Sequence, residues 1–376
     1  MKKKKGRPKK PKSLLEKILI IATILGGIAA IGYFVDKMFF PTAPKKVVEE
    51  LERKVGEMAE YLDGLPGTKN PQLKRLFEKG HSLYKDEKYT EAIDTFKVCL
   101  KLKTEDTERE ALLILIGNAL STLGKRQEAE AHYQEALLIG KRINDQEGEA
   151  RALGNIGLIY YAKGELDTAL KYHQDALEIN KQIGRKEGEA SALGNIGLVY
   201  EAKGELDLAL KRFEEVLVVE RELRRRWGEA NALGNIGLVY QAKGELDLAL
   251  KYLQDALKID KEIGFKQGEA SDLGNIGLVY SARGRSASGR PAKGELDLAL
   301  KYHQKSLEIS KQIGYRQNEA SQLGNIGLVY ETKGNLKDAL KYYNKALKIF
   351  EEIGMPKEIE GTKGNIERVK KEMKNE

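Results

Sequence analysis

Apolar residues along most of this chain recur at the spacing of amphipathic α-helices, and glycines interrupt that spacing at regular intervals. Within residues 146–184 the pattern predicts one helix over Glu147–Gly164 and a second over Glu165–Ile183. Gly164 breaks the chain between the two helices. Gly184 follows the second helix, where a residue of left-handed conformation is favoured. The pattern therefore predicts a helix–turn–helix unit.

The same unit recurs along the chain. The phrase Leu-Gly-Asn-Ile-Gly occurs five times, at Leu153–Gly157, Leu193–Gly197, Leu233–Gly237, Leu273–Gly277 and Leu323–Gly327. Three steps are 40 residues long and the last is 50, because Arg283–Ala292 is inserted. That insertion carries three arginines, two glycines and a proline, which is typical of a loop between two helices. A fixed period of this size indicates stacked units that bury their apolar faces against neighbours.

The positions shared by the units resemble the tetratricopeptide repeat. In the unit above, the residues that carry the resemblance are Leu153, Gly157, Tyr160, Gly164, Ala169, His173 and Ala176. The 40-residue spacing is similar to that of the long-repeat subgroup, which includes kinesin light chain and GoLoco-binding G-protein scaffolds. The resemblance implies an all-α fold, a right-handed superhelical solenoid of helix–turn–helix repeats that binds other proteins.

Seven such repeats fit residues 72–355, and residues 356–376 fit a C-terminal capping helix and tail. We expect residues 1–17 to form a basic cytoplasmic tail, and residues 36–71 a linker with an amphipathic helix. In that helix, apolar residues alternate steps of three and four as in a coiled coil, at Val48, Leu51, Val55, Met58 and Leu62. This short coiled-coil pattern indicates either a dimerising stalk or a cap on the first repeat.

Ile18–Val35 is an uncharged run of eighteen residues. As a helix it would span roughly 27 Å, so it predicts a single transmembrane helix before the array. Nine positive residues precede it and only Lys37 follows closely, which predicts a cytoplasmic N-terminus and an extracytoplasmic repeat array. A signal peptide cleaved near Ala30-Ile31-Gly32 is the alternative.

The basic character of the chain is confined to its N-terminal part. The formal net charge is +8, whereas residues 1–46 alone carry twelve Lys or Arg and two acids, so the remainder sums to −2. A nearly neutral array disfavours nucleic acid as its partner. Lys4–Lys12 resembles an AT-hook, or it orients the membrane helix and attracts anionic lipid. A DNA- or lipid-binding regulator acting through residues 1–12 is therefore one alternative function.

One asparagine recurs in the first helix of each regular repeat, and in the resembled family this position faces the concave groove. An amide has one acceptor and two donors, so it can bind the N–H and the C=O of one peptide unit. The row therefore predicts binding of an extended partner segment by its backbone. In the alternative interpretation, each amide bonds a neighbouring helix and stiffens the stack. The row is Asn155, Asn195, Asn235, Asn275 and Asn325.

Selectivity is expected from the residues around the amides. These are Arg151 and the leucines three positions after each asparagine, namely Leu158, Leu198, Leu238, Leu278 and Leu328. Arg151–Asn155 only partly matches the family's clamp for C-terminal carboxylates, and Asn231 and Asn235 two repeats on lack the charge that it requires. Trp227, the only tryptophan, lies in the sequence LRRRW that replaces the usual Ile-Gly turn. It either anchors a partner or fills a gap between repeats, and packing is the favoured interpretation.

We find no catalytic motif, cofactor site or metal site. The four histidines are scattered, and the single cysteine cannot form an internal disulfide. The sequence therefore predicts a non-enzymatic, membrane-anchored scaffold that holds a protein or peptide segment in its groove. A self-associating structural solenoid, and thus a homo-oligomer, is the second alternative.

Overall fold

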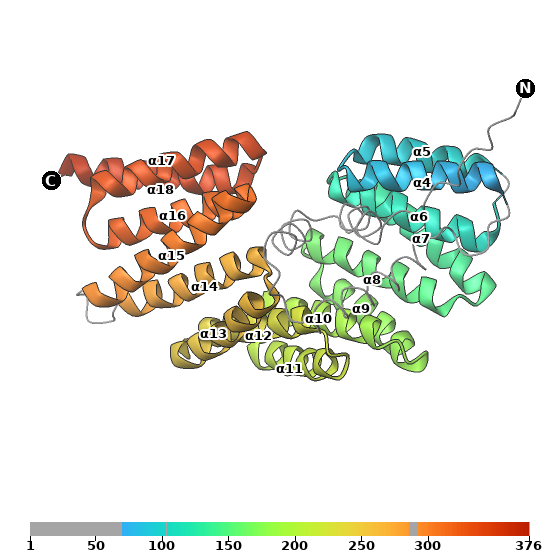
Figure 1. Ribbon diagram of the computed structural model, residues 1–376, viewed down its shortest axis with the longest axis horizontal. Coiled ribbons are helices and arrows are strands. Elements are labelled where there is room, and N and C mark those ends of the chain that lie inside the picture. Colours follow the sequence, from blue (N-terminus) through green and yellow to red (C-terminus); the bar gives the residue numbers. More distant parts are fainter. Residues whose placement is uncertain (1–69, 103, 286–291, 376) are drawn as a thin grey trace, which may run out of the picture. The chain divides into compact units, whose positions relative to one another are not determined.

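The computed structural model describes residues 70–102, 104–285 and 292–375, and every regular element in these ranges is a helix. The chain divides into two compact units, residues 1–143 and residues 144–376. Among the described residues the first unit contains α4–α7 and the second α8–α18 (Figure 1). The predicted all-α array of paired helices is confirmed. Each unit is described by itself below.

The first unit consists of two antiparallel helix pairs, α4 with α5 and α6 with α7. Each pair closes over a glycine: a Cβ on Gly80 would lie 2.6 Å from the Phe96 ring, and one on Gly117 would lie 2.4 Å from the Tyr133 ring. These are the two repeats that depart most from the regular pattern, and they still pack in the same way. The helices are α4 (Pro71–Lys85), α5 (Tyr89–Lys101), α6 (Asp106–Thr122) and α7 (Arg126–Ile143).

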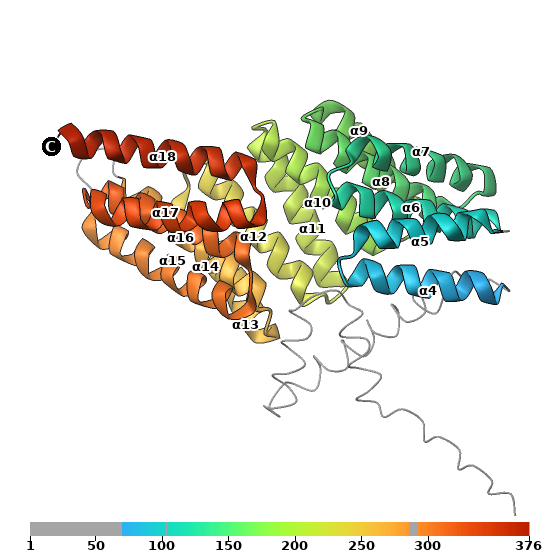
Figure 2. The ribbon, with the colours of Figure 1, turned by 90° about the horizontal axis from the view of Figure 1, so that it is seen from above.

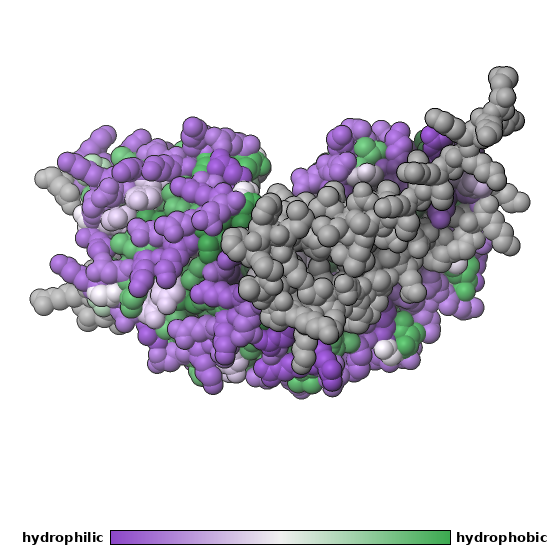
Figure 3. Space-filling view, viewed as in Figure 1, coloured by the Kyte–Doolittle hydropathy of each residue, from purple (hydrophilic) through white to green (hydrophobic). Residues whose placement is uncertain are grey.

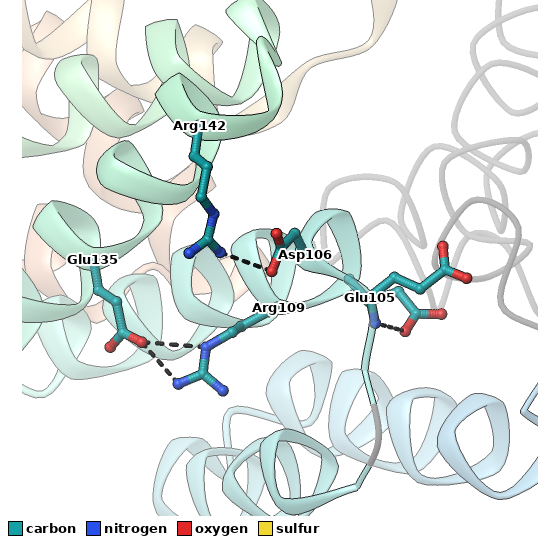
Figure 4. Close-up of polar contacts among 6 residues, drawn as sticks. Glu105, Asp106, Arg109, Glu135 and Arg142 are labelled. Atoms are coloured by element: carbon teal, nitrogen blue, oxygen red, sulfur yellow. Dashed lines mark hydrogen bonds and ion pairs between the residues drawn. The ribbon is translucent and has the colours of Figure 1, made fainter.

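Polar contacts hold α6 against α7 near the start of α6 (Figure 4). The Arg109 guanidinium donates to Glu135 at 2.8 Å, and Arg142 donates to Asp106 at 2.8 Å. A capping box begins α6, because the Glu105 backbone N–H donates at 2.8 Å to a carboxylate one turn further on. Exposed ion pairs of this kind stabilise a fold weakly, by about 0–1 kcal/mol each. Apolar packing therefore supplies most of the stability of the α6–α7 pair.

The second unit contains five helix pairs and a final single helix, and consecutive helices pack side by side, as Figure 2 shows for α15–α18. Among the first helices, α8 also touches α10, α12 touches α14, and α14 touches α16. The helices are α8 (Gln146–Lys163), α9 (Leu166–Gln182), α10 (Lys186–Ala202), α11 (Leu206–Glu222), α12 (Arg226–Ala242), α13 (Leu246–Ile263), α14 (Lys266–Gly284), α15 (Lys293–Ile313), α16 (Arg316–Thr332), α17 (Leu336–Ile353) and α18 (Pro356–Asn375).

The second glycine of the repeated phrase lies where the two helices of a pair approach most closely. A Cβ on Gly197 would lie 2.6 Å from the buried Phe213 ring, and one on Gly157 would lie 2.6 Å from the His173 ring. Glycine is therefore present for packing, which explains why the helices retain a residue that disfavours helix by about 1 kcal/mol. In all five pairs one slot of the second helix meets this glycine, and it holds His173, Phe213, Leu253, His303 and Tyr343.

The insertion leaves the stacking register of the repeats unchanged. The Ala292 N–H donates to the Gly284 carbonyl at 3.0 Å, which closes the neck of the loop, and residues 286–291 lie outside the described ranges. On both sides of the loop, a cation at the end of one first helix pairs with an aspartate near the start of the preceding second helix. The pairs are Lys203–Asp167, Lys243–Asp207, Arg283–Asp247 and Lys333–Asp297.

The predicted membrane localisation requires correction. The predicted basic tail, the membrane helix at residues 18–35 and the coiled-coil pattern of the next segment lie outside the described residues. Within the described ranges, no helix is both long enough and apolar enough to cross a bilayer, since each carries charged side chains along its exposed face. The prediction of a single-pass membrane protein with an extracytoplasmic array is thus wrong on the structure described.

Candidate partner-binding face

One face of each first helix in the second unit remains uncovered by its neighbours. In α10 the buried positions include Leu193 and Ile196, whereas Ser191, Asn195 and Leu198 stay exposed or half-buried. These three residues are four and three positions apart, so they share one side of the helix. The same side is open in α8, α12, α14 and α16. The open sides of these five helices are together called the first-helix face.

The predicted asparagine row lies on the first-helix face. All five asparagines, including Asn155 on α8, are half-buried. Among the described residues, four of the five amides have no hydrogen-bond partner, and their atoms are not sealed from solvent: Asn195, Asn235, Asn275 and Asn325. These four amides therefore do not bond neighbouring helices, and their hydrogen-bonding capacity remains available. That the row binds a partner stays a prediction.

The predicted leucine row lies beside the amides. Leu158 is 43% exposed, and its four counterparts Leu198, Leu238, Leu278 and Leu328 are half-buried. In the space-filling view, apolar side chains show among hydrophilic ones over α14–α16 (Figure 3). At the other end of the row, Arg151 donates to Glu147 at 2.8 Å, and Glu147 also pairs with Arg185 at 3.2 Å. The charge of Arg151 is thus already compensated, which adds to the argument against a carboxylate clamp.

The glycine before each asparagine has no side chain, so it can leave room for the backbone of a partner beside the amide. Open space surrounds a Cβ built on Gly154 or Gly324, and Gly194 has only an ordinary contact at 4.0 Å. At Gly274 the space is filled, because the Gln322 side chain from α16 would lie 2.5 Å from a Cβ there. Room beside the amide is therefore present at Gly154, Gly194 and Gly324, whereas Gln322, which replaces the usual alanine of the next repeat, fills it at Gly274.

The sequence interpretation did not anticipate a chain of buried polar groups in α15 and α16. His303 Nδ1 lies 2.8 Å from Gln322 Oε1, Gln322 donates to Asn318 at 2.9 Å, and Asn318 donates to Ser310 at 2.8 Å. Burial lowers the pKa of His303 to about 4, so the imidazole is neutral at physiological pH. These groups bond one another inside the stack, which indicates a structural role, although His303 Nε2 has no hydrogen-bond partner among the described residues.

Two further buried groups are carboxyls, Asp260 on α13 and Asp272 on α14. Burial, followed by the charge of Asp260, raises the pKa of Asp272 to about 8. Burial, followed by the charge of Glu269, raises the pKa of Asp260 to about 7. Asp272 Oδ2 and Asp260 Oδ1 have no hydrogen-bond partner in the described part of the chain. Within that part, no group of three or more His, Cys, Asp or Glu could hold a metal ion.

The fold defines a class of protein: a helical-repeat array of stacked helix pairs, here with one side of each first helix left open. The sequence profile of the tetratricopeptide repeat matches residues 108–182, 148–219, 228–288 and 292–352, which together cover more than half of the chain. The chain therefore belongs to the tetratricopeptide repeat family. The resemblance inferred from the repeated phrase is confirmed.

Two curated relatives match part of the chain. G-protein-signaling modulator 1 of Homo sapiens is 29% identical over 119 residues, which are 28% of this chain and 17% of that protein. Photosystem I assembly protein Ycf3 of Rippkaea orientalis is 29% identical over 89 residues, which are 24% of this chain and 48% of that protein. The chain thus spans less than half the length of either relative. The first match agrees with the predicted similarity to G-protein scaffolds.

Solved structures show the same fold at low sequence identity. Apo RapI has a TM-score of 0.58 at 17% identity, covering 75% of this chain and 99% of its own. A Rap protein complexed with Competence and Sporulation Factor has a TM-score of 0.56 at 14% identity, covering 96% and 99%. A signal-transduction ATPase with a tetratricopeptide repeat sensor from Pyrococcus horikoshii has a TM-score of 0.58 at 16% identity, covering 95% and 56%.

Proposed function

We propose that this protein is a non-enzymatic scaffold that holds an extended segment of a partner protein on the first-helix face. The observation that carries the proposal is the row of amides without partners at Asn195, Asn235, Asn275 and Asn325. A half-buried amide without a hydrogen bond gains stabilisation when a partner supplies one, by about 0.5–1.5 kcal/mol per bond. A single such group carries little weight, whereas four at equivalent positions form a repeated binding element.

The spacing of the row suits a polypeptide backbone. Packed helices lie about 10 Å apart, and an extended chain rises about 3.3 Å per residue. One amide on each first helix would therefore meet about every third peptide unit of a bound segment. Each amide would accept from the backbone N–H and donate to the backbone C=O of that unit. Such an arrangement would recognise the extended backbone of the partner and not its side chains.

The leucine row would supply the apolar part of the contact. Leu198 and Leu238 stand one turn from the amides on their helices and are only half-buried, so a bound segment would cover them. Binding by an array of this fold has a precedent, since the Rap protein of similar fold was crystallised with Competence and Sporulation Factor. The proposal assigns no cofactor and no reaction to the face.

The test removes three amides from the middle of the row. We expect the triple variant Asn195→Ala, Asn235→Ala, Asn275→Ala to lose binding to peptides selected on the full chain from a random dodecapeptide library. Losing several hydrogen bonds should raise the dissociation constant by about a hundredfold, which corresponds to a loss of ~3 kcal/mol in binding free energy. Fluorescence anisotropy with the labelled peptides measures the effect, and far-UV circular dichroism checks that the helices remain.

A matched control removes three amides from the second helices instead. Gln174, Gln254 and Gln304 occupy one equivalent, exposed position on α9, α13 and α15. Their triple replacement by alanine should leave peptide binding unchanged. Equal binding by both triple variants and the unmodified chain would overturn the proposal, as would failure to select any peptide.

A further inference from the structure

Helix α12, in the middle pair of the second unit, presents a different set of side chains from its neighbours. Its buried positions include Ala230, Leu233 and Ile236. Trp227 and Asn231 are exposed, four positions apart, and they continue the open side of the helix that carries Asn235 and Leu238. The first-helix face therefore has an indole and a second amide on this helix.

Trp227 does not fill a gap between repeats, which was the interpretation favoured from the sequence. The side chain is 46% exposed, and its ring N–H has no hydrogen-bond partner among the described residues. The loop-to-helix turn is instead packed by other groups: Glu220, which is buried, accepts from Arg225 at 2.7 Å. An exposed tryptophan supported by a rigid helix resembles the anchor residues that dominate protein interfaces.

The neighbouring helices lack these features. At the position of Trp227, α10 has Glu187 and α14 has Gln267. At the position of Asn231, α14 has Ser271, whose hydroxyl donates to the Gln267 carbonyl of its own helix at 3.0 Å. Asn231, by contrast, has no hydrogen-bond partner in the described part of the chain. Helix α12 thus offers more unused binding capacity than the helices beside it.

The turn before α12 carries one positive charge that no carboxylate among the described residues neutralises. In the turn before α12, Arg225 pairs with Glu220 at 2.7 Å, and Arg226, the first residue of α12, pairs with Glu262 at 2.7 Å. Arg224 is exposed and has no ion-pair partner among the described residues. It adopts a positive φ of 53° at a position where four other repeats have glycine, namely Gly184, Gly264, Gly314 and Gly354. The turn therefore carries one uncompensated cation close in sequence to the exposed indole.

We infer that Trp227 and Asn231 determine which segments bind, and that the preferred segment is extended and carries an aromatic side chain beside a carboxylate. The aromatic ring would stack on the indole, the neighbouring peptide unit would bond the Asn231 amide, and the carboxylate would pair with Arg224. The inference rests on the proposed function, because it assigns selectivity to a surface that the asparagine row is proposed to make. Charge complementarity with Arg224 selects an acidic segment over a basic one.

The chain contains only one tryptophan, so its fluorescence reports on this site alone. We expect dodecapeptides selected on the full chain to be enriched in an aromatic residue next to Asp or Glu, and their binding to change the Trp227 emission.

Trp227→Gln, which introduces the residue that α14 has at this position, should raise the dissociation constant of these peptides about tenfold or more. Arg224→Gly should raise it less, and that effect should shrink at high salt because screening weakens the ion pair. Gln267→Ala, at the same position of α14, is the matched control and should leave binding unchanged.

Two outcomes separate this inference from the proposed function. If selected peptides bind Trp227→Gln as tightly as the unmodified chain but lose affinity for the triple asparagine variant, the face binds segments and the selectivity inference is wrong. If the triple asparagine variant and Trp227→Gln both bind the selected peptides with full affinity, the proposed function and the selectivity inference are both wrong. Enrichment of basic peptides, or peptide binding with no change in the Trp227 emission, would also overturn the inference.

Discussion

Gly197→Ala should lower the free energy of unfolding by about 1–3 kcal/mol, although alanine ordinarily favours a helix more than glycine does. The added Cβ would lie 2.6 Å from Cε1 of Phe213, a ring that is fully buried between α10 and α11. Such a separation is far below van der Waals contact, so the ring must leave its rotamer or the helices must move apart. Either change disturbs the core of the pair.

The matched control lies on the same helix. A Cβ on Gly194 would meet only Val216 Cγ2, at an ordinary distance of 4.0 Å. Gly194→Ala should therefore raise the stability of α10 by up to about 1 kcal/mol, because alanine is the better helix former. The two variants make the same Gly→Ala change, but they are expected to change the free energy of unfolding in opposite directions. Equal effects of the two substitutions would contradict close helix–helix approach as the reason for the glycine at position 197.

Urea unfolding followed by circular dichroism measures the total change in stability. Arrays of repeats can unfold in stages, so amide hydrogen exchange in α10 and α11 is the sharper measurement. In Gly197→Ala we expect faster exchange in these two helices than in α16 and α17. A uniform change in all helices would argue against a local packing defect.

Asp272→Ala should stabilise the protein at pH 8 by about 2–4 kcal/mol. Asp272 is buried in α14, and its Oδ2 has no hydrogen-bond partner in the described residues. Alanine occupies the equivalent position in three other repeats, at Ala152, Ala192 and Ala232. The substitution thus replaces a buried acid by the residue that the same packing environment accepts elsewhere.

The sign of the pH dependence follows from the direction of the pKa shift. Burial raises the pKa of Asp272 from 3.8 to about 8, so the folded state binds the proton more tightly than the unfolded chain. The folded protein therefore loses stability as the pH rises from about 4 to about 8. The pKa of Asp260 is raised to about 7 in the same region, which adds to the loss. Removing Asp272 should flatten this part of the stability curve and change little below about pH 4.

Thermal or urea unfolding at pH 5 and pH 8 tests the expectation. The exposed Asp255 on α13 provides the control, and Asp255→Ala should shift stability equally and slightly at both pH values. If Asp272→Ala destabilised the protein at pH 8, the carboxylate would have a stabilising partner, and the raised pKa would be wrong.

The helix pairs and their period could be derived from the sequence because they depend on short-range regularities. Apolar spacing, the turn glycines and the repeated phrase each recur within one unit, and the phrase also located the packing glycine and the insertion. Even Arg224 in place of a turn glycine keeps the left-handed conformation, with φ of 53°. The uncharged run at residues 18–35 carried the membrane prediction by itself, and the described helices gave it no support.

Only the tertiary structure decided which side chains remain available. The sequence does not show whether a neighbouring repeat hydrogen-bonds the amide of a helical asparagine. In the structure, four of the amides have no hydrogen-bond partner among the described residues. Trp227 proved to be exposed, and Asp272 proved to be buried without a partner. The physical reason is range: helix formation depends on residues three and four positions apart, whereas burial and hydrogen bonding depend on what the next repeat brings, about 40 residues away.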